Sequence, residues 1–231
     1  MRIQKYLSQK GVLSRRETEA FILKGLIKVN GKIVRELGTQ IDPEKDKVEV
    51  SGAGKQEAAK KITVAIYKPR EVVCSKSEFE GTTVFDVFPQ FKDLNVVGRL
   101  DKDSEGLLLL SNDGVVTSAI TGKEHLIEKE YEVFTRETIS DGKAKKMEEG
   151  IELDGKKTLP AKVKIMDSNK FRIILKEGRK HQIRRMTTAV YLTVVKLKRL
   201  RIGNIDSRGL TPGKFRILSP LEVERLKSLA R

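Results

Sequence analysis

Residues 98–114, GRLDKDSEGLLLLSNDG, place a charged loop directly before four consecutive leucines. A second apolar segment, at 94–97, ends where the loop begins. Short apolar runs bounded by turn residues are typical of buried strands, and polar loops between core strands often carry functional side chains. This stretch predicts strands at 94–98 and 106–111, joined by a loop that presents Asp101. The residue type alone leaves the role of Asp101 open, because an aspartate here, like Asp103, also suits a turn or a cap.

The segments around this loop combine many short strands with a few helices. Further strands are expected at 62–67, 129–135, 162–166, 171–176 and 192–197. Helices are expected at 114–121, 140–149, 181–190 and 220–230. Such a pattern, without a repeat of fixed period, indicates an α+β domain built on a mixed or antiparallel sheet.

The first 50 residues predict a small separate module. An apolar helical face at 3–9 precedes Ser14 and Glu17, which have the spacing of a capping box for a second helix. The dipeptide Asn30-Gly31 lies between two alternating apolar runs, which is the pattern of a tight hairpin. Residues 51–61, SGAGKQEAAKK, are small, polar or charged and cannot bury a core. The predicted organisation is a domain at 1–50, a linker at 51–61 and a larger domain at 62–231.

The charge of the chain indicates a polyanionic partner. Its 231 residues include 47 Lys and Arg against 32 Asp and Glu, a formal net charge of +15. Residues 170–216 alone hold fourteen basic residues and only two acids, Glu177 and Asp206. Because protein surfaces normally mix both signs, we interpret this region as a phosphate-binding face. A merely solvated basic surface is the alternative interpretation.

The composition also excludes several classes of protein. Cys74 is the only cysteine, and His125 and His181 are the only histidines, so neither a disulfide framework nor a metal site built on these residue types is expected. No apolar run is long enough to span a membrane, and the start of the chain lacks the apolar segment of a signal peptide. We therefore expect a cytoplasmic protein.

The segment 52–55, GAGK, invites comparison with a nucleotide-binding phosphate loop. That pattern needs glycine at position 49 and serine or threonine at position 56, whereas the chain has Glu49 and Gln56. No nucleotide cofactor is therefore implied.

Two further segments carry candidate functional residues. In 129–133, KEYEV, strand alternation sets Tyr131 on one face. Such tyrosines usually pack in a core, but a functional one would stack on a ring and move a proton. In 177–186, EGRKHQIRRM, a basic segment opens a helix on which Arg184 and Arg185 point about 100° apart. His181 has no second histidine or triad partner, which favours a hydrogen-bonded structural role over general-base catalysis.

Together these segments resemble one family. The stretch 98–114 resembles the catalytic signature of the bacterial pseudouridine synthases of the RsuA/RluB/RluE/RluF type. KEYEV resembles their tyrosine motif and EGRKHQIRRM their arginine motif, while Tyr67-Lys68-Pro69 is similar to their upstream Lys-Pro motif. Residues 1–50 are similar to the alpha-L RNA-binding domain. The resemblance covers residues 1–50 and 62–225.

The sequence departs from this family at two glycines. Glu71 stands where the Lys-Pro motif usually continues to a glycine, and Val190-Tyr191 replaces a Leu-Gly pair at the end of the arginine-motif helix. The second change bears on how that helix ends.

The resemblance implies isomerisation of a uridine to pseudouridine in ribosomal RNA, a reaction without metal or cofactor. It implies that Asp101 acts at the ribose as nucleophile or base, that Tyr131 stacks on the uracil and removes the proton at carbon five, and that Arg184 pairs with Asp101. Such a partner would keep the carboxylate ionised in a dry pocket. Further substrate contacts implied are Arg99, Ile183, Lys68, Arg179 and Arg185. Contacts of the alpha-L domain with RNA are assigned to Lys5, Arg15, Arg16 and Lys28.

Three functions remain in competition on sequence alone. The leading hypothesis is a ribosomal RNA pseudouridine synthase, with large-subunit RNA favoured over small-subunit RNA and either free RNA or an assembling subunit as partner. The second is an RNA-binding ribosome-assembly factor that needs no catalysis. It has no need of the complete set Asp101, Tyr131 and Arg184. A basic nuclease is the weakest, since clustered acids or a pair of histidines would be expected.

Overall fold

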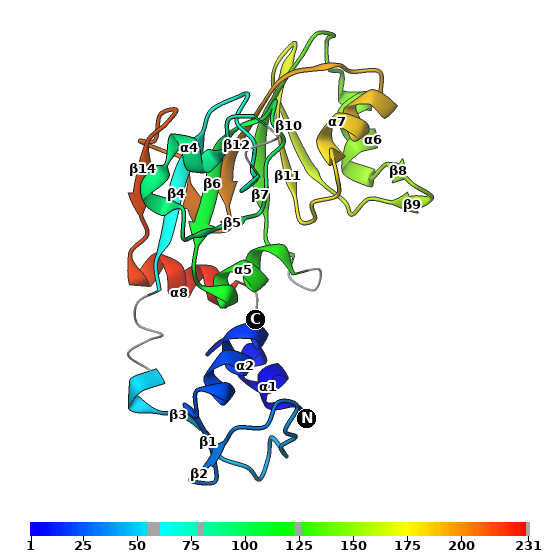
Figure 1. The fold of residues 1–231 in the computed structure, drawn as a ribbon. Coiled ribbons are helices and arrows are strands. Elements are labelled where there is room, and N and C mark those ends of the chain that lie inside the picture. The colour runs from blue at the N-terminus through cyan, green and yellow to red at the C-terminus, as the bar shows by residue number, and fades with distance from the viewer. Residues whose placement is uncertain (55–60, 78–80, 123–125, 230–231) are drawn as a thin grey trace.

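The computed structural model describes residues 1–54, 61–77, 81–122 and 126–229 (Figure 1). Most of the predicted linker, with Lys55 of the GAGK segment, and His125 lie outside the described residues. Among the residues described, no helix is long and apolar enough to cross a membrane.

The N-terminal module is a pair of helices beside a small sheet. Its elements are α1 (Ile3–Gln9), α2 (Arg15–Leu23), β1 (Ile27–Val29), β2 (Lys32–Val34) and β3 (Val48–Val50), with the strand order β2-β1-β3. The predicted capping box forms: the Ser14 hydroxyl accepts from the Glu17 backbone, and the Glu17 carboxylate accepts from the Ser14 backbone. A core of seven buried apolar side chains, including Ile3, Phe21 and Ile27, holds the module together.

The larger module is built on one mixed sheet with the order β10-β11-β7-β12-β6-β4-β14, to which β13 and β5 add at β12 and β6. Its strands are β4 (Thr63–Lys68), β5 (Asn95–Val97), β6 (Glu105–Ser111), β7 (Lys129–Thr135), β10 (Lys162–Asp167), β11 (Lys170–Leu175), β12 (Val194–Ile202), β13 (Ile205–Asp206) and β14 (Phe215–Ile217). The β12–β6 pair is parallel, whereas the other pairs in this sheet are antiparallel. The predicted α+β class and mixed sheet are confirmed.

The four leucines after the charged loop belong to β6, a strand in which every residue is buried. Strand alternation sends Leu107 and Leu109 into one core cluster and Leu108 and Leu110 into another, and all four are completely buried. A strand covered on both faces reads as a continuous apolar run. The loop before it is therefore attached to a rigid element.

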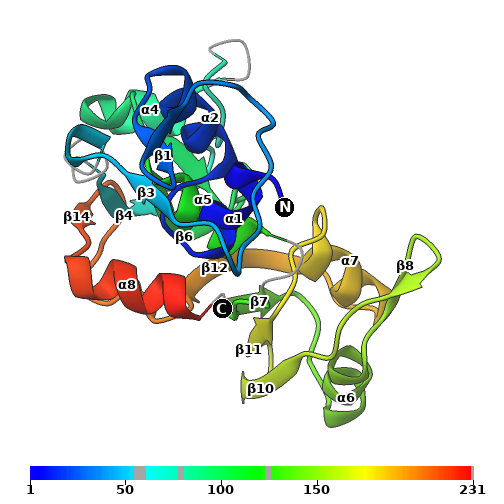
Figure 2. The same ribbon diagram turned by 90° about the horizontal axis from the view of Figure 1, so that it is seen from below.

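Helices cover the sheet in three groups. The elements are α4 (Val84–Val87), the 3-10 turn η2 (Pro89–Phe91), α5 (Gly114–Thr121), α6 (Asp141–Glu149), α7 (Gln182–Ala189) and α8 (Pro220–Ser228). Apolar residues of α5 and α8 join the Leu107 cluster, and those of α4 and η2 join the Leu108 cluster. Residues of α6 and α7 form a third cluster with β7, β11 and β12. Beyond α6 lies the small hairpin of β8 (Glu152–Leu153) and β9 (Lys156–Lys157) (Figures 1 and 2).

The two modules touch where α5 begins. Lys61 Nζ lies 2.9 Å from Glu17 Oε1 of α2 and 3.4 Å from Asp113 Oδ1, the N-cap of α5. Gly114 faces Ser14 so closely that an added Cβ atom would lie 2.4 Å from the serine Oγ. The end of the 98–114 stretch is therefore also the docking point of the N-terminal module (Figure 1).

Candidate functional site

The charged loop between β5 and β6 is closed by glycines and by its own backbone. Gly98 and Gly106 both have positive φ, +70° and +105°, which residues with a side chain rarely adopt. Inside the loop, the Ser104 backbone amide donates to the Asp101 carbonyl at 3.1 Å. Asp101 therefore stands on a short, turned segment rather than on an extended one.

The structure brings the three predicted motifs together. Leu100, which precedes Asp101, shares one core cluster with Tyr131 of β7 and Ile183 of α7. Tyr131 and Ile183 are both buried, whereas the Asp101 side chain keeps 39% of its surface exposed. Asp101 is therefore a half-exposed carboxylate that directly follows a residue of this cluster.

The side chain that contacts Asp101 differs from the expected one. His181 Nε2 lies 3.5 Å from Asp101 Oδ1, whereas Arg184 Nη2 approaches the backbone carbonyl of Asp103, also at 3.5 Å. His181 is the N-cap of α7 and has a left-handed backbone, φ 51°. That conformation turns the imidazole toward the loop, and Arg184, one turn later, reaches past Asp101. The Arg184–Asp101 pair is not formed in this structure, and His181 contacts the candidate carboxylate, which the sequence did not reveal.

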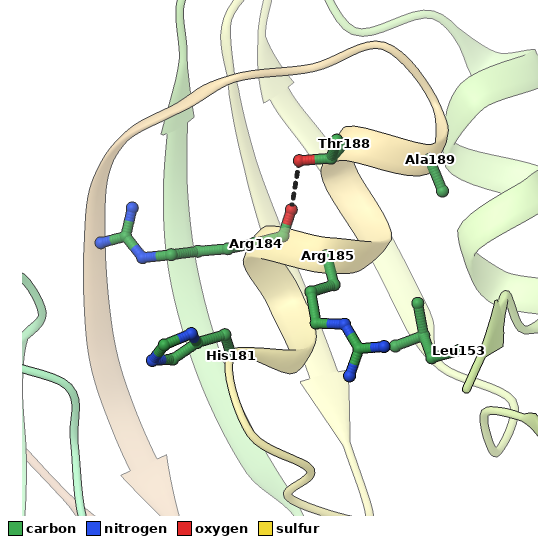
Figure 3. A pocket seen from close by; sticks show the side chains of 6 residues that line it. All are labelled: Leu153, His181, Arg184, Arg185, Thr188 and Ala189. Atoms are coloured by element: carbon green, nitrogen blue, oxygen red, sulfur yellow. Dashed lines mark hydrogen bonds between the residues drawn. The ribbon is translucent and has the colours of Figure 1, made fainter.

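A pocket of about 410 Å³ opens on the outer side of α7. Its lining residues are Leu153, His181, Arg184, Arg185, Thr188 and Ala189 (Figure 3). Figure 3 shows His181 and Arg184 projecting to the same side of the helix, with Arg185 directed toward Leu153. A basic pocket next to the Asp101 loop suits a negatively charged ligand.

Two of the arginines predicted to contact substrate form hydrogen bonds to other groups of the protein. Both terminal guanidinium nitrogens of Arg185 donate to the Asp154 carboxylate, at 2.6 and 2.9 Å. Arg179 donates to Glu177 and to the carbonyls of Lys156 and Lys157. These contacts link the β8–β9 hairpin to the start of α7, and a direct contact with substrate stays a prediction for both residues.

Lys68 is also placed differently from a substrate-binding lysine. Its side chain is completely buried, and its ammonium donates to the carbonyls of Pro69, Val72 and Lys102 at 2.8, 2.7 and 3.2 Å. Burial lowers the pKa of Lys68, and nearby acidic groups, Cys74 and Asp101 foremost, oppose that effect. This position is unsuited to direct substrate contact and ties the Lys-Pro segment to the Asp101 loop.

The remaining predicted residues are accessible. Arg99 is exposed beside Asp101, and Lys5, Arg15 and Arg16 are exposed on the N-terminal module, where Lys28 is half-buried. A hollow of about 460 Å³ on that module includes Lys5 and Arg15 among its lining residues. These positions suit contacts with an extended polyanion.

The local charge of residues 170–216 is largely compensated in space. At least eight of the fourteen basic side chains form ion pairs, several with acids distant in sequence: Lys170, Arg172, Arg179, Arg185, Lys196, Arg201, Arg208 and Arg216. Glu128, Glu130 and Glu132 of the β7 region supply much of this compensation. The single-signed face expected from the sequence is therefore reduced to a smaller set of cations.

Two further observations in the described part of the chain concern metal-ligating and thiol groups. There, no group of three or more His, Cys, Asp or Glu side chains is arranged to hold a metal ion. Burial raises the pKa of the Cys74 thiol, which disfavours the reactive thiolate.

Two buried cations behind the site were not singled out from the sequence. Arg199 of β12 and Lys129 of β7 are 2% and 8% exposed. Burial lowers the pKa of Lys129 to about 8, with the charge of Arg199 as a further cause. The sequence held a signal for their burial. Each residue falls in an alternating strand, at a position that shares one face with buried apolar residues.

Comparison with known proteins agrees with this geometry. Residues 62–189 match the family described as RNA pseudouridylate synthase, and residues 1–48 match the S4 domain. The chain is 38% identical to the ribosomal large subunit pseudouridine synthase B of Bacillus subtilis, with 99% of this chain and 96% of that protein covered. It is 32% identical to the ribosomal small subunit pseudouridine synthase A of Haemophilus influenzae, with 98% and 99% covered.

A solved structure extends the likeness to three dimensions. A crystal structure of a pseudouridylate synthase matches with a TM-score of 0.71 and 30% sequence identity, over 98% of this chain and 99% of that one. The two family matches cover residues 1–48 and 62–189, and these relatives match the chain over nearly its full length. The chain belongs to the RNA pseudouridine synthase family and carries an N-terminal S4 domain.

Proposed function

We propose that this protein isomerises a uridine of ribosomal RNA to pseudouridine and that Asp101 is the carboxylate the reaction requires. The observation that carries the proposal is the convergence of three separate segments: Leu100, which directly precedes Asp101, meets Tyr131 and Ile183 in one core cluster. Binding alone would not need a half-exposed carboxylate next to the cluster that holds a buried tyrosine.

The reaction balances without a co-reactant. The bond from N1 of uracil to C1′ of ribose breaks, the base turns, and a bond from C5 to C1′ forms. The proton on C5 leaves, and N1 takes up a proton. Asp101 acts at the ribose as nucleophile or base, and Tyr131 stacks on the uracil and receives the C5 proton. Ile183 packs on the other face of the base.

The target base must leave its stack to reach Asp101, which costs a few kcal/mol. Arg99, which is exposed two residues before Asp101, fills the space that the base vacates in this proposal. Phosphate contacts by Lys5, Arg15, Arg16 and Lys28 of the S4 domain offset the remaining cost. Arg184 supplies a permanent positive charge at the pocket beside the loop.

We infer that large-subunit RNA is the substrate. The relative named for the large subunit is 38% identical, and the one named for the small subunit is 32% identical. The KDSEGLLLLSNDG and EKEYEV segments also resemble the large-subunit members of the family more than the small-subunit members.

Tritium release from ribosomal RNA labelled at carbon five of uridine tests the proposal. Wild type, Asp101→Asn and Asp103→Asn are compared on large- and small-subunit RNA. Asp103 is the matched control, because it is an exposed aspartate of the same loop. We expect release by wild type and by Asp103→Asn and none by Asp101→Asn, with RNA affinity of the inactive variant within several-fold of wild type.

The outcomes separate the hypotheses. Release by a folded Asp101→Asn variant, with folding checked by circular dichroism, would refute the assigned role of that carboxylate. Release from small-subunit RNA alone would refute the subunit assignment. If wild type releases no tritium from free RNA or from assembling subunits, the chain is an RNA-binding factor instead.

A further inference from the structure

Arg199 of β12 is a completely enclosed charge with two well-defined partners. It heads the fully buried side chains in volume, and only 2% of the residue is exposed. A buried guanidinium is tolerated only when its donors are paired. Its Nε donates to the Leu107 carbonyl at 2.7 Å, and its Nη2 donates to the Gly98 carbonyl at 2.7 Å. These two carbonyls stand at the two ends of the loop that carries Asp101.

The backbone of Arg199 also contacts this loop, at Gly106. Arg199 is the register partner of Gly106 in the parallel β6–β12 pair. A Cβ atom at Gly106 would lie 2.3 Å from the Arg199 carbonyl oxygen and 2.8 Å from its nitrogen, so only glycine fits there. The Arg199 side chain bonds to the carbonyls of Gly98 and Leu107, and its backbone packs against Gly106, so Arg199 contacts both ends of the 98–106 loop.

Arg199 also connects this loop to the tyrosine. On its other side, β12 pairs with β7, and Arg199 is there the register partner of Tyr131. A single residue is therefore bonded to both ends of the Asp101 loop and lies in direct register with Tyr131. Within β12, which the structure describes in full, no other residue has this double relation to the two proposed reacting groups.

We propose that Arg199 is a positioning residue for the isomerisation, which clasps the loop and holds Asp101 at a fixed distance from Tyr131. The inference rests on the proposed function of those two residues. An arginine suits the task because its planar fork reaches two carbonyls at once and keeps its charge when buried. A lysine at this position has a single ammonium group, which we expect to bond to the carbonyl at only one end of the loop.

The first test separates positioning from stability. Single-turnover rate and RNA affinity are measured for Arg199→Met, Arg199→Lys and the control Leu226→Ala, at a temperature where circular dichroism shows all of them folded. Leu226 is equally buried but belongs to α8 and the Leu107 cluster. We expect Arg199→Met to react about 100-fold more slowly, since displacing a reacting group by about 1 Å costs that much. RNA affinity should stay within about two-fold, Arg199→Lys should recover part of the rate, and the control should react like wild type.

The second test reads the loop directly and does not need activity. In Arg199→Met, the Ser104 amide, which is bonded to the Asp101 carbonyl, should exchange its hydrogen about ten-fold faster, while amides of β11 keep their protection. If Arg199→Met does not fold, Arg199→Lys carries both measurements.

Two results would overturn the positioning role of Arg199. One is a rate loss no larger than that of Leu226→Ala, and the other is an increase in exchange spread over the whole sheet. If wild type itself is inactive, the proposed function fails, and the exchange at Ser104 still decides whether Arg199 orders the loop.

Discussion

His181 Nε2 lies 3.5 Å from Asp101 Oδ1, and both side chains remain open to solvent, 49% and 39% exposed. The contact exists because α7 begins at a left-handed histidine that turns its ring toward the β5–β6 loop. Arg184 stands one turn further on and lines the same pocket. The candidate carboxylate therefore has a titratable neighbour in contact and a permanent cation close by.

These two neighbours should contribute unequally to the reaction. An exposed pair with an imidazole contributes little, because water screens it and the ring is charged only when protonated. We expect His181→Gln to slow tritium release by less than about ten-fold and Arg184→Gln by about 100-fold or more, the loss seen when one charge-stabilising donor is removed. Single-turnover rates at neutral pH measure both. A larger loss for His181→Gln would show that the imidazole, not the guanidinium, supports Asp101.

Gly114 should control the docking of the S4 domain. Its missing side chain makes room for Ser14, since a Cβ atom would lie 2.4 Å from Ser14 Oγ and 3.1 Å from Glu17 Oε2. We expect Gly114→Ala to separate the modules and to increase the radius of gyration measured by X-ray scattering. Gly142→Ala is the control, because nothing lies within 4 Å of its added methyl group.

A second variant makes the cause specific. Ser14→Gly removes the clashing atoms and, as glycine is an acceptable N-cap, costs only a few tenths of a kcal/mol. Combined with Gly114→Ala, it should restore the wild-type radius. An unchanged radius in Gly114→Ala alone would contradict the docking contact.

The fold was predictable where burial dominates. The runs that became β6 and β7 and the capped helices α5 and α6 were located to within a residue, because apolar periodicity and N-cap chemistry act locally. The elements α4, β8, β9 and β14 were missed. They are two to four residues long, and β14 is a half-exposed edge strand whose pairing with β4 is decided by the tertiary structure.

The sequence indicated which segments meet near Asp101 but not which side chains pair with one another. The motifs lie as their order implied, since Leu100, next to Asp101, shares a core cluster with Tyr131 and Ile183; the roles of these residues stay predictions. A sequence shows the type of a charged residue but not its partner, which is why Lys68 and Arg185 were assigned to substrate. Three backbone carbonyls surround Lys68, and Asp154, 31 residues away, holds Arg185. Charge counted along 170–216 likewise overlooked the acids that β7 supplies across the sheet.

Lys129 should make stability depend on pH in the alkaline range. Burial lowers its pKa from 10.5 to about 8 in the folded protein, so between these values the unfolded chain binds the extra proton. The buried charge of Lys129 therefore destabilises the folded protein fully below pH 8. This destabilisation disappears as the pH rises from 8 to 10.5. We expect Lys129→Met to be more stable than wild type at pH 7 and to lose that advantage toward pH 10. Urea unfolding at several pH values measures the difference, and a constant difference would show that Lys129 is not the titrating group.

The exposed cations of the S4 domain should set RNA affinity without affecting chemistry. Lys5 and Arg15 line one hollow, and removing a side chain that binds a phosphate lowers the log–log salt slope of binding by about one. We expect the double variant Lys5→Gln/Arg15→Gln to bind RNA about ten-fold more weakly at moderate salt, with an unchanged rate at saturation. The charge-matched control is Lys45→Gln/Lys47→Gln, whose lysines pair with Asp42 and Glu49. An equal loss of affinity in the control would mean that only net charge matters.

Tyr191 should carry removable backbone strain. It has φ 59° and occupies the position after α7 where a helix usually ends in glycine. The Tyr191 amide donates to the Thr188 carbonyl, and the Leu192 amide donates to the Thr187 carbonyl. The tyrosine is 85% exposed, so its removal disturbs little packing. A left-handed residue with a side chain costs about 1–2 kcal/mol, and glycine returns about 0.5–1 kcal/mol of this as chain entropy. Tyr191→Gly should therefore raise the midpoint of thermal unfolding by about 1–4 °C. Tyr191→Ala, which removes the ring but keeps the Cβ atom, should not, and an equal gain in both variants would assign the effect to the exposed ring instead of the backbone.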